Sequence, residues 1–598
     1  MRCFAKIINP DYMGNKYHIG GSTLLKFRQG RELKKISGAI AVSFLLGGLA
    51  LPKGEAAPAD FEPPTAGELI NEHQENREVE GIMLPTGKAE VNTPDERPQL
   101  DLPDELKVEV KGFKVTGQDI FPEEKLQAVL EPRKGKLLTF KELEDGADDL
   151  AAYFRDKGYV AVRVYLPVQK ITNGIVEYAI VVGRFDQLTV INHTDIHDAA
   201  VNREVRCLKK GEYLTKEKLQ RAIWLLSDLA GADAKATISE GSEPGTVHVE
   251  IDLNKHKGKQ GLITVDNYGN RYTGYGELGV YYDFLNLAKE GDHFAVGGLL
   301  TGRNLYNYGL NYTIPILTDG LKLSAGYNVL RYHLGKEYDN LDGSGTARIS
   351  SLGLDYAIRR SQKNNLYAGV RYDFSELKDE YRALHLTYAE KHGHALILSL
   401  YGDETDHYGS TYWRLDNKFG MVGFDSQLTE QWFAGSRTEG SYYKLRGSIL
   451  RRQDLHQRSY LLLSARGQWS STNLDSSEHI SLGGFSGVRA YPQSEASGDC
   501  GIIARAELRW LLPLKQKDQQ LQLAAYYDYG ALRINKDAGT AVGSNYRHLQ
   551  GIGLGLIWSR YEDWFIRADY AWRIDGEEPI SDTSSSNGCF WLRGGVYF

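Results

Sequence analysis

The chain has 598 residues, which is room for several domains, and its formal net charge of −7 gives no electrostatic case for a nucleic-acid partner. It is rich in glycine (64) and tyrosine (37) and poor in methionine (4) and cysteine (4), which suits antiparallel sheets with aromatic interfaces. After residue 60 no apolar run reaches the roughly 18 residues of a membrane-spanning helix. A helical membrane protein is therefore disfavoured, whereas half-apolar membrane strands are not.

Residues 1–59 have the order of a secretory signal peptide with an extended basic start. Basic residues between 26 and 35 precede an apolar run from Ile36 to Leu51, and small residues around Ala57 offer a cleavage site. An uncleaved anchor is the alternative, but this run of 16 residues is short for one. Translation beginning at Met13 also stays open. We predict that the chain is exported.

The next two segments are polar. Residues 60–83 predict a charged helix from Ala66 to Glu80, without a wide apolar stripe to bury. Residues 84–106 contain four prolines and indicate a linker. Composition alone does not separate such a helix from a disordered leader.

Two small α/β units follow, at 107–183 and 184–255. In the first, Leu143, Ala147, Leu150 and Phe154 share one face of a helix, and Thr139 with Glu142 has the pattern of a capping box. The other elements expected there are a strand at Lys107–Val115, a helix at Pro122–Leu130 and strands at Tyr159–Pro167 and Gly174–Val182. The second unit repeats the plan with a strand at Phe185–Ile191, a helix from Thr215 and strands at Lys235–Ser239 and Thr246–Leu253. These apolar stripes indicate cores.

From residue 260 to 598 the apolar period becomes two, which predicts a membrane β-barrel. Leu461, Leu463 and Trp469, for example, alternate with Tyr460 and Arg466. One apolar face with aromatic ends and one polar face is what a strand between lipid and a wet lumen needs. At about 20 residues per strand and turn, this region predicts about 16 antiparallel strands.

One glycine-rich stretch near the end breaks the alternation. Its centre is Gly483-Gly484-Phe485-Ser486-Gly487-Val488-Arg489-Ala490-Tyr491-Pro492. Residues 481–507 resemble the sixth extracellular loop and following strand of two-partner secretion outer-membrane transporters (TpsB, the haemolysin secretion/activation type), which share a superfamily with outer-membrane barrel-assembly proteins. The loop signature there is Val-Arg-Gly-Tyr/Phe, matched here by Val488, Arg489 and Tyr491, with Ala490 in place of glycine.

The resemblance extends over nearly all of the chain after the signal peptide. Residues 111–183 closely resemble a POTRA domain, and 184–255 resemble a second. It implies a barrel of 16 strands at 260–598, an inward loop around 483–500 and a plug-like helix at 60–83.

A second motif supplies a partner for the loop arginine. The strand from Leu521 to Gly530 alternates, so Asp528 points into the lumen, where it suits an arginine carried in by a loop. Tyr526-Tyr527-Asp528-Tyr529-Gly530 resembles the family's Phe-x-Asp-x-Gly motif, with Tyr526 in the Phe position. The resemblance thus implies that Arg489 contacts Asp528 and locks the loop to the barrel. The alternative is a solvated loop arginine and an unrelated lumen charge.

The chain ends in an aromatic residue, Phe598, on the apolar face of the last strand. Such an end resembles the recognition signal for the outer-membrane insertion machinery. Alternatively, it only completes a hydrophobic strand.

The implied function is secretion of a large haemolysin- or adhesin-like exoprotein by two-partner (type V) secretion. The POTRA domains would bind the cargo in the periplasm by adding a strand to a sheet edge. Expected partners are that exoprotein, outer-membrane lipid and the barrel-assembly machinery, and the transporter is expected to be a monomer in the outer membrane of a diderm bacterium.

Three rival functions are weaker. An outer-membrane assembly factor of the same superfamily usually has more POTRA domains, and a passive porin needs none. A surface enzyme has no support, because no phosphate-binding loop or recognisable Ser/His/Asp arrangement occurs. His193, Asp195, His197 and Asp198 are expected to form a polar turn, so no metal or cofactor is predicted. A Cys500–Cys589 bridge is left open.

Overall fold

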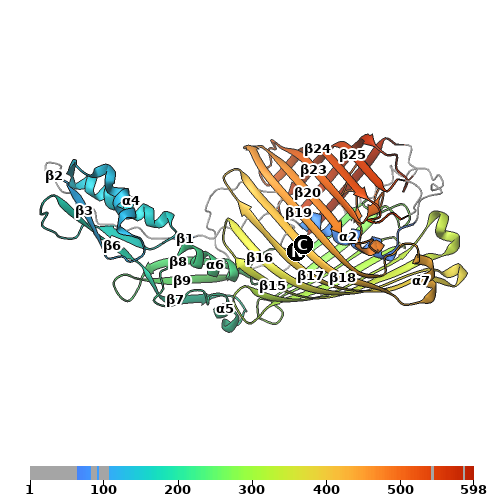
Figure 1. The fold of residues 1–598 in the computed structure, drawn as a ribbon, viewed down its shortest axis with the longest axis horizontal. Coiled ribbons are helices and arrows are strands. Elements are labelled where there is room, and N and C mark those ends of the chain that lie inside the picture. Colours follow the sequence, from blue (N-terminus) through green and yellow to red (C-terminus); the bar gives the residue numbers. More distant parts are fainter. Residues whose placement is uncertain are drawn as a thin grey trace, which may run out of the picture.

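The computed structural model describes residues 63–81, 91–92, 107–256, 258–302, 304–539, 544–582 and 586–598. The predicted signal peptide, 1–59, lies outside the described residues, as does the linker 84–106 apart from 91–92. Two α/β units extend from one end of a large barrel, and helix α2 (Ala66–Gly81) lies inside the barrel (Figure 1). No helix among the described residues is long and apolar enough to cross a membrane.

The first unit packs two helices on a three-stranded sheet. Its elements are β2 (Lys107–Glu109), β3 (Gly112–Thr116), α3 (Glu123–Leu130), β4 (Leu137–Thr139), α4 (Phe140–Asp156), β5 (Val162–Tyr165) and β6 (Ile175–Val182). Strand β6 is central, parallel to β3 and antiparallel to β5. Thr139 and Glu142 form the capping box at the start of α4, whose apolar face is buried in the core of the unit.

One predicted strand of this unit, Lys107–Val115, is divided in two. Its first part, β2, pairs with β4, and its second part, β3, pairs with β6. Between them Lys111 donates its backbone N–H to the carbonyl of Gly174, and Val110 is fully buried. The prediction of one continuous strand was wrong because the backbone changes partner at this point.

The second unit repeats the order of the first. Its elements are β7 (Arg184–Asn192), α5 (Asp198–Glu204), α6 (Lys216–Ser227), β8 (Ala232–Glu240) and β9 (Thr246–Lys255). Strand β9 is parallel to β7 and antiparallel to β8, as β6 is to β3 and β5. Two features were not predicted from the sequence. The polar turn continues into α5, and linker strand β1 (Val91–Asn92) pairs in parallel with β8.

The second unit is fixed to the near end of the barrel by ion pairs. Arg360 donates from Nε and Nη2 to both carboxylate oxygens of Asp228, each at 2.7 Å, and its guanidinium lies over the ring of Trp224. Arg221 Nε donates to Asp319 Oδ2 at 2.8 Å. These contacts orient α6 against the turns of the barrel that follow β13 and β15.

The barrel closes with sixteen antiparallel strands, which confirms the predicted fold class. Its first half is β10 (Gly261–Asp266), β11 (Glu277–Leu285), β12 (His293–Thr301), β13 (Leu305–Pro315), β14 (Leu321–His333), β15 (Gly343–Arg359), β16 (Asn364–Tyr381) and β17 (Leu386–Thr405). Its second half is β18 (Gly409–Phe424), β19 (Gly440–His456), β20 (Ser459–Ser470), β23 (Cys500–Leu512), β24 (Gln519–Arg533), β25 (Tyr546–Arg560), β26 (Trp564–Gly576) and β27 (Gly588–Tyr597). A short helix, α7 (Gln427–Phe433), lies between β18 and β19.

The middle strands are longer than the sequence suggested. Strand β17 has 20 residues and β16 has 18, whereas a tilted bilayer crossing needs only about 9–11. Alternation alone set the expected length, and it does not mark where a strand leaves the bilayer. Figure 1 shows these strands running far past helix α2 at the end opposite the α/β units.

Candidate functional site

The lumen of the barrel holds two segments, α2 and the inner loop, by which we mean residues 471–499 between β20 and β23. Within the inner loop are a 3-10 turn, η4 (Ser476–Glu478), and two paired short strands, β21 (Ile480–Ser481) and β22 (Ser497–Gly498). The tip of the inner loop is tightly packed, since Val488, Arg489, Ala490 and Tyr491 are each at most 1% exposed. A buried loop of this kind needs partners for its polar groups.

The structure places Arg489 directly against Asp528 of β24. Arg489 Nε donates to Oδ2 and Nη2 donates to Oδ1, both at 2.8 Å, and the backbone N–H of Arg489 also donates to Oδ2 at 3.2 Å. This is the two-toothed geometry in which arginine binds a carboxylate most specifically. Burial alone works to lower the pKa of Arg489, but Asp528 and Glu507 together hold it above its ordinary value.

Arg489 belongs to a larger charged network that sequence analysis missed. Arg489 Nη1 donates to Glu507 Oε2 at 2.7 Å and lies 3.7 Å from Asp569 Oδ1. Further arginines bind the same carboxylates: Arg505 lies 3.4 Å from Asp528, Arg509 2.6 Å from Glu507, and Arg567 2.6 Å from Asp569. The signal was present as charges two residues apart on β23 and β26. Only the register between strands shows that they meet.

The other residues of the two motifs form the surface against which the loop tip packs. The guanidinium of Arg489 lies 3.3 Å above the ring centre of Tyr526. A Cβ on Gly530 would lie 3.0 Å from Val488 Cγ2, so Gly530 leaves room for that side chain. Trp591 Nε1 donates to the carbonyl of Arg489 at 2.7 Å and ties the tip to the last strand.

Helix α2 buries a short apolar stripe against the barrel wall. Ala66, Leu69 and Ile70, spaced as one helical face, pack with residues of β13 to β16. The backbone N–H of Ala66 donates to Asp379 Oδ1 at 2.9 Å. This stripe of three residues agrees with the expectation that the helix has no wide apolar stripe.

The opposite, polar face of α2 lies on the inner loop. Glu72 accepts from the backbone N–H of Ser494 at 3.1 Å, from its hydroxyl at 2.8 Å, and from Gln493 Nε2. Glu68 accepts from Ser497 Oγ at 2.9 Å. Burial raises the pKa of Glu72 above its ordinary value. The same loop therefore binds the barrel wall through Arg489 and α2 through the residues that follow it.

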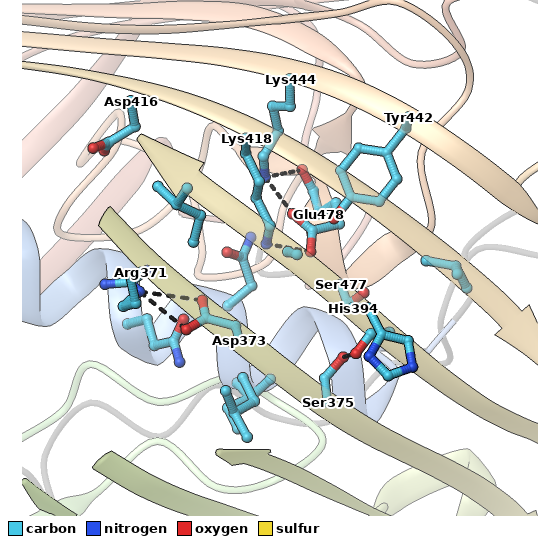
Figure 2. Close-up of a pocket in the computed structure, with 18 of the residues that line it drawn as sticks. Arg371, Asp373, Ser375, His394, Asp416, Lys418, Tyr442, Lys444, Ser477 and Glu478 are labelled. Atoms are coloured by element: carbon cyan, nitrogen blue, oxygen red, sulfur yellow. Dashed lines mark hydrogen bonds and ion pairs between the residues drawn. The ribbon is translucent and has the colours of Figure 1, made fainter. Parts of the chain in front are cut away.

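A pocket lies between α2 and the wall formed by β16 to β19. It is lined by Asn71 and Gln74 of the helix and by charged side chains of the wall: Arg371, Asp373, Arg414, Asp416, Lys418, Lys444 and Arg446. Figure 2 shows Lys418 and Lys444 both directed at Glu478 of η4, at 2.5 and 2.7 Å. The charged lining suits water or a polar molecule better than an apolar ligand.

Phe598 lies at the closing seam of the barrel. Its backbone N–H donates to the carbonyl of Gly261 at 3.0 Å, and the N–H of Gly261 donates back to Phe598 at 3.0 Å. The ring covers Gly261, where a Cβ would lie 2.3 Å from Phe598 Cζ. The terminal residue thus takes part in the pairing of the last strand with the first.

The remaining sequence candidates are not brought into the site as a cluster. Cys500 and Cys589 are free thiols, so the bridge left open above is not formed, and Cys589 Sγ instead donates to the carbonyl of Ala490 at 3.5 Å. Asp195 accepts from Lys255 at 2.6 Å, and His193 lies 3.4 Å from Asp252. Within the described part of the chain, no three His, Cys, Asp or Glu side chains are grouped to hold a metal.

Comparison with known proteins agrees with this architecture. Residues 108–183 match the model of the ShlB-type POTRA domain, and residues 245–557, more than half of the chain, match the haemolysin secretion/activation protein ShlB/FhaC/HecB. The heme/hemopexin transporter protein HuxB of Haemophilus influenzae (strain 86-028NP) is 24% identical over 93% of this chain and 97% of its own length. The outer membrane transporter CdiB of Escherichia coli is 23% identical over 78% of this chain and 82% of its own length.

Solved structures show the same fold. CdiB from Escherichia coli superimposes with a TM-score of 0.68 at 18% identity, covering 90% of this chain and all of the other. CdiB from Acinetobacter baumannii gives 0.61 at 16% identity with the same coverage. The chain belongs to the haemolysin secretion/activation protein ShlB/FhaC/HecB family, and it is a two-partner secretion transporter of the outer membrane with its POTRA region in the periplasm.

Proposed function

We propose that this transporter conducts one large, unfolded exoprotein through the lumen that α2 and the inner loop occupy at rest. Helix α2 is the plug, and the contact between Arg489 and Asp528 locks the inner loop to the wall. The observation that carries the proposal is the burial of Arg489 in a network of carboxylates inside the barrel. A charge so deep in a protein costs stability unless every partner is in place.

The POTRA units are the binding site for the cargo. A three-stranded sheet offers two edges to an incoming extended strand. In the first unit the sheet edges are β3 and β5, while in the second β1 pairs with the edge of β8. Strand β7 is the open edge of the second sheet, so the edges of β3, β5 and β7 are the sites where cargo adds first, and the transporter acts as a monomer. Folding of the exoprotein outside the cell biases its movement outward without nucleotide hydrolysis.

Secretion by an Arg489→Ala variant tests the lock. The full chain is co-expressed with a candidate exoprotein in an outer-membrane host, and exoprotein in the medium is measured. We expect Arg489→Ala to abolish secretion while the barrel still inserts, as shown by heat-modifiable gel mobility. The loss of the guanidinium removes the two parallel hydrogen bonds to Asp528 and the ion pair to Glu507, and leaves both carboxylates buried with one cation fewer, a cost of up to about 3–5 kcal/mol.

Two further variants interpret the result. Arg489→Lys keeps the charge but not the two parallel hydrogen bonds, so it should secrete poorly. Arg533→Ala removes an arginine of the same strand β24, one that donates to the carbonyl of Asn535 at 3.1 Å, and should secrete normally. Normal secretion by Arg489→Ala would refute the lock. Phe598→Ala should reduce the amount of inserted barrel rather than secretion per barrel, if Phe598 is the assembly signal.

A further inference from the structure

The inner loop has a second anchor on the barrel wall, far in sequence from Arg489. Lys391 of β17 donates to Asp475 at 2.6 Å, Lys418 of β18 to Glu478 Oε1 at 2.5 Å, and Lys444 of β19 lies 2.7 Å from Glu478 Oε2. Lys444 Nζ also donates to the carbonyl of Glu478 at 2.9 Å. We call these three lysines, with Asp475 and Glu478, the lysine clamp.

The lysine clamp is buried. The side chains of Lys391, Lys444 and Asp475 are at most 7% exposed, and Lys418 and Glu478 are 18% and 12% exposed. Despite that burial, Lys418 and Lys444 hold the pKa of Glu478 well below its ordinary value, so the carboxylate is charged. Gln468 Nε2 adds a hydrogen bond to the carbonyl of Glu478 at 2.8 Å. Three neighbouring strands thus fix a single turn of the loop, η4.

Helix α2 rests directly on that turn. Thr65, just before the helix, shares a hydrogen bond with Ser476 (Oγ1 to Oγ, 2.9 Å), and Asn71 Nδ2 donates to the carbonyl of His479 at 2.5 Å. Between these two contacts the backbone of Gly67 lies against Ser477. A Cβ on Gly67 would be 2.6 Å from Ser477 Cβ and 3.0 Å from its Cα, too close for any real side chain.

We propose that the lysine clamp and Gly67 form the seat of the plug: the clamp sets the position of η4, and η4 sets whether α2 closes the pore. Helix α2 packs between two surfaces. One is the apolar wall of β13 to β16, and the other is the inner loop, which the lysine clamp holds against the helix. The inference rests on the proposed function, in which α2 is a plug. It assigns the closed state to residues distinct from the Arg489 lock.

The two anchors of the inner loop should therefore give opposite phenotypes. Loss of Arg489 disrupts the tip and stops secretion, whereas loss of the lysine clamp frees α2 and opens the pore. Gly67→Ala gives the sharpest test, because alanine favours a helix over glycine. If the seat controls the pore, Gly67→Ala displaces α2 from the lumen even though alanine stabilises the helix itself.

The measurement is the open fraction of single channels of the purified full chain in planar lipid bilayers. We expect Gly67→Ala and Lys444→Met each to raise the open fraction about tenfold or more, the factor that ~1.4 kcal/mol produces. Two matched controls should stay closed. Gln74→Ala removes a side chain from the same helix that lines the pocket, and Lys378→Met removes an exposed lysine of β16 paired with Glu380 at 3.1 Å.

A charge reversal distinguishes loss of the ion pair from general misfolding of the barrel. Lys391→Asp alone should open the pore, and Lys391→Asp combined with Asp475→Lys should close it again. If Gly67→Ala and Lys444→Met both stay closed, the seat is refuted. Deletion of residues 63–81 separates this result from the proposed function. A pore that opens on that deletion but not in Lys444→Met refutes only the seat, whereas a pore unchanged by the deletion refutes the plug itself.

Discussion

At the scale of single residues, the lumen shows how buried charges are tolerated. Four arginines (489, 505, 509 and 567) face three carboxylates (507, 528 and 569), and each ion has an opposite neighbour within 3.4 Å. Such a network is weak evidence for stability, but it favours a defined geometry, since removing one member leaves its buried partners with fewer opposite charges. The network therefore fixes where the loop tip lies.

Packing at the same tip shows how the structure accommodates Ala490, where the family signature has glycine. Ala490 lies against Gly551 of β25, where an added Cβ would be 2.4 Å from Ala490 Cβ. We expect Gly551→Ala to displace the tip at a cost of about 1–3 kcal/mol, as overpacking usually does. Secretion by Gly551→Ala should fall, and Ala490→Gly in the same chain should restore it.

That rescue is the informative result. Ala490→Gly alone should secrete normally, because it only removes a methyl group from the contact. If Gly551→Ala secretes normally without the second change, the tip does not need its close fit to β25. If the double variant stays inactive, the loss has a cause other than the contact between these two methyl groups.

At the scale of elements, the sequence predicted the faces and bounds of strands and helices better than it predicted their neighbours in space. Alternation correctly gave the outward face of β24, where Leu523 and Tyr527 are exposed, and the inward face with Asp528. It did not give the second partner of Asp528, Arg505, which faces it through the register of β23 on β24. Helix α2 was predicted within one residue of its bounds. Its neighbours were not, since they come from segments about 200 to 430 residues away.

Near its middle, α2 contains a histidine, His73, from which we predict that docking of the helix depends on pH. His73 Nε2 lies 3.6 Å from Glu277 Oε1. Burial works to lower the pKa of His73, but Glu277 and Glu72 raise it above its ordinary 6.5. A group whose pKa is higher in the docked state stabilises docking at low pH, and that stability is lost as the pH rises through the docked pKa.

The open fraction of the wild-type pore should therefore rise as the pH is raised above about 6.5. His73→Gln should flatten this dependence, and His385→Gln, an exposed residue on a turn after β16, should not. Channel recordings across the pH range test the sign. An open fraction that falls with rising pH would contradict the assignment.

At the scale of the whole molecule, we propose that the two α/β units receive the cargo and that the segments inside the barrel gate its passage. The second POTRA-like unit is held to the barrel through Asp228 and Arg360. In the function proposed above, cargo bound to the units is therefore presented at a fixed place near the lumen. The lumen holds α2, which packs on β13 to β16, and the inner loop, whose tip binds β23 and β24. The resemblance to the family implied the loop contact and a plug-like helix, but the wall residues that hold the helix follow only from the fold.

The central claim is that α2 must leave its seat for cargo to pass, and a reversible cross-link tests it most directly. The test uses a variant in which Cys207, Cys500 and Cys589 are replaced by serine. In that background, Thr65→Cys and Ser476→Cys place two thiols where the hydroxyl oxygens now lie 2.9 Å apart. With both forms inserted, the oxidised transporter should release no exoprotein, and reduction should restore secretion. Equal secretion by the fully cross-linked form would contradict the account.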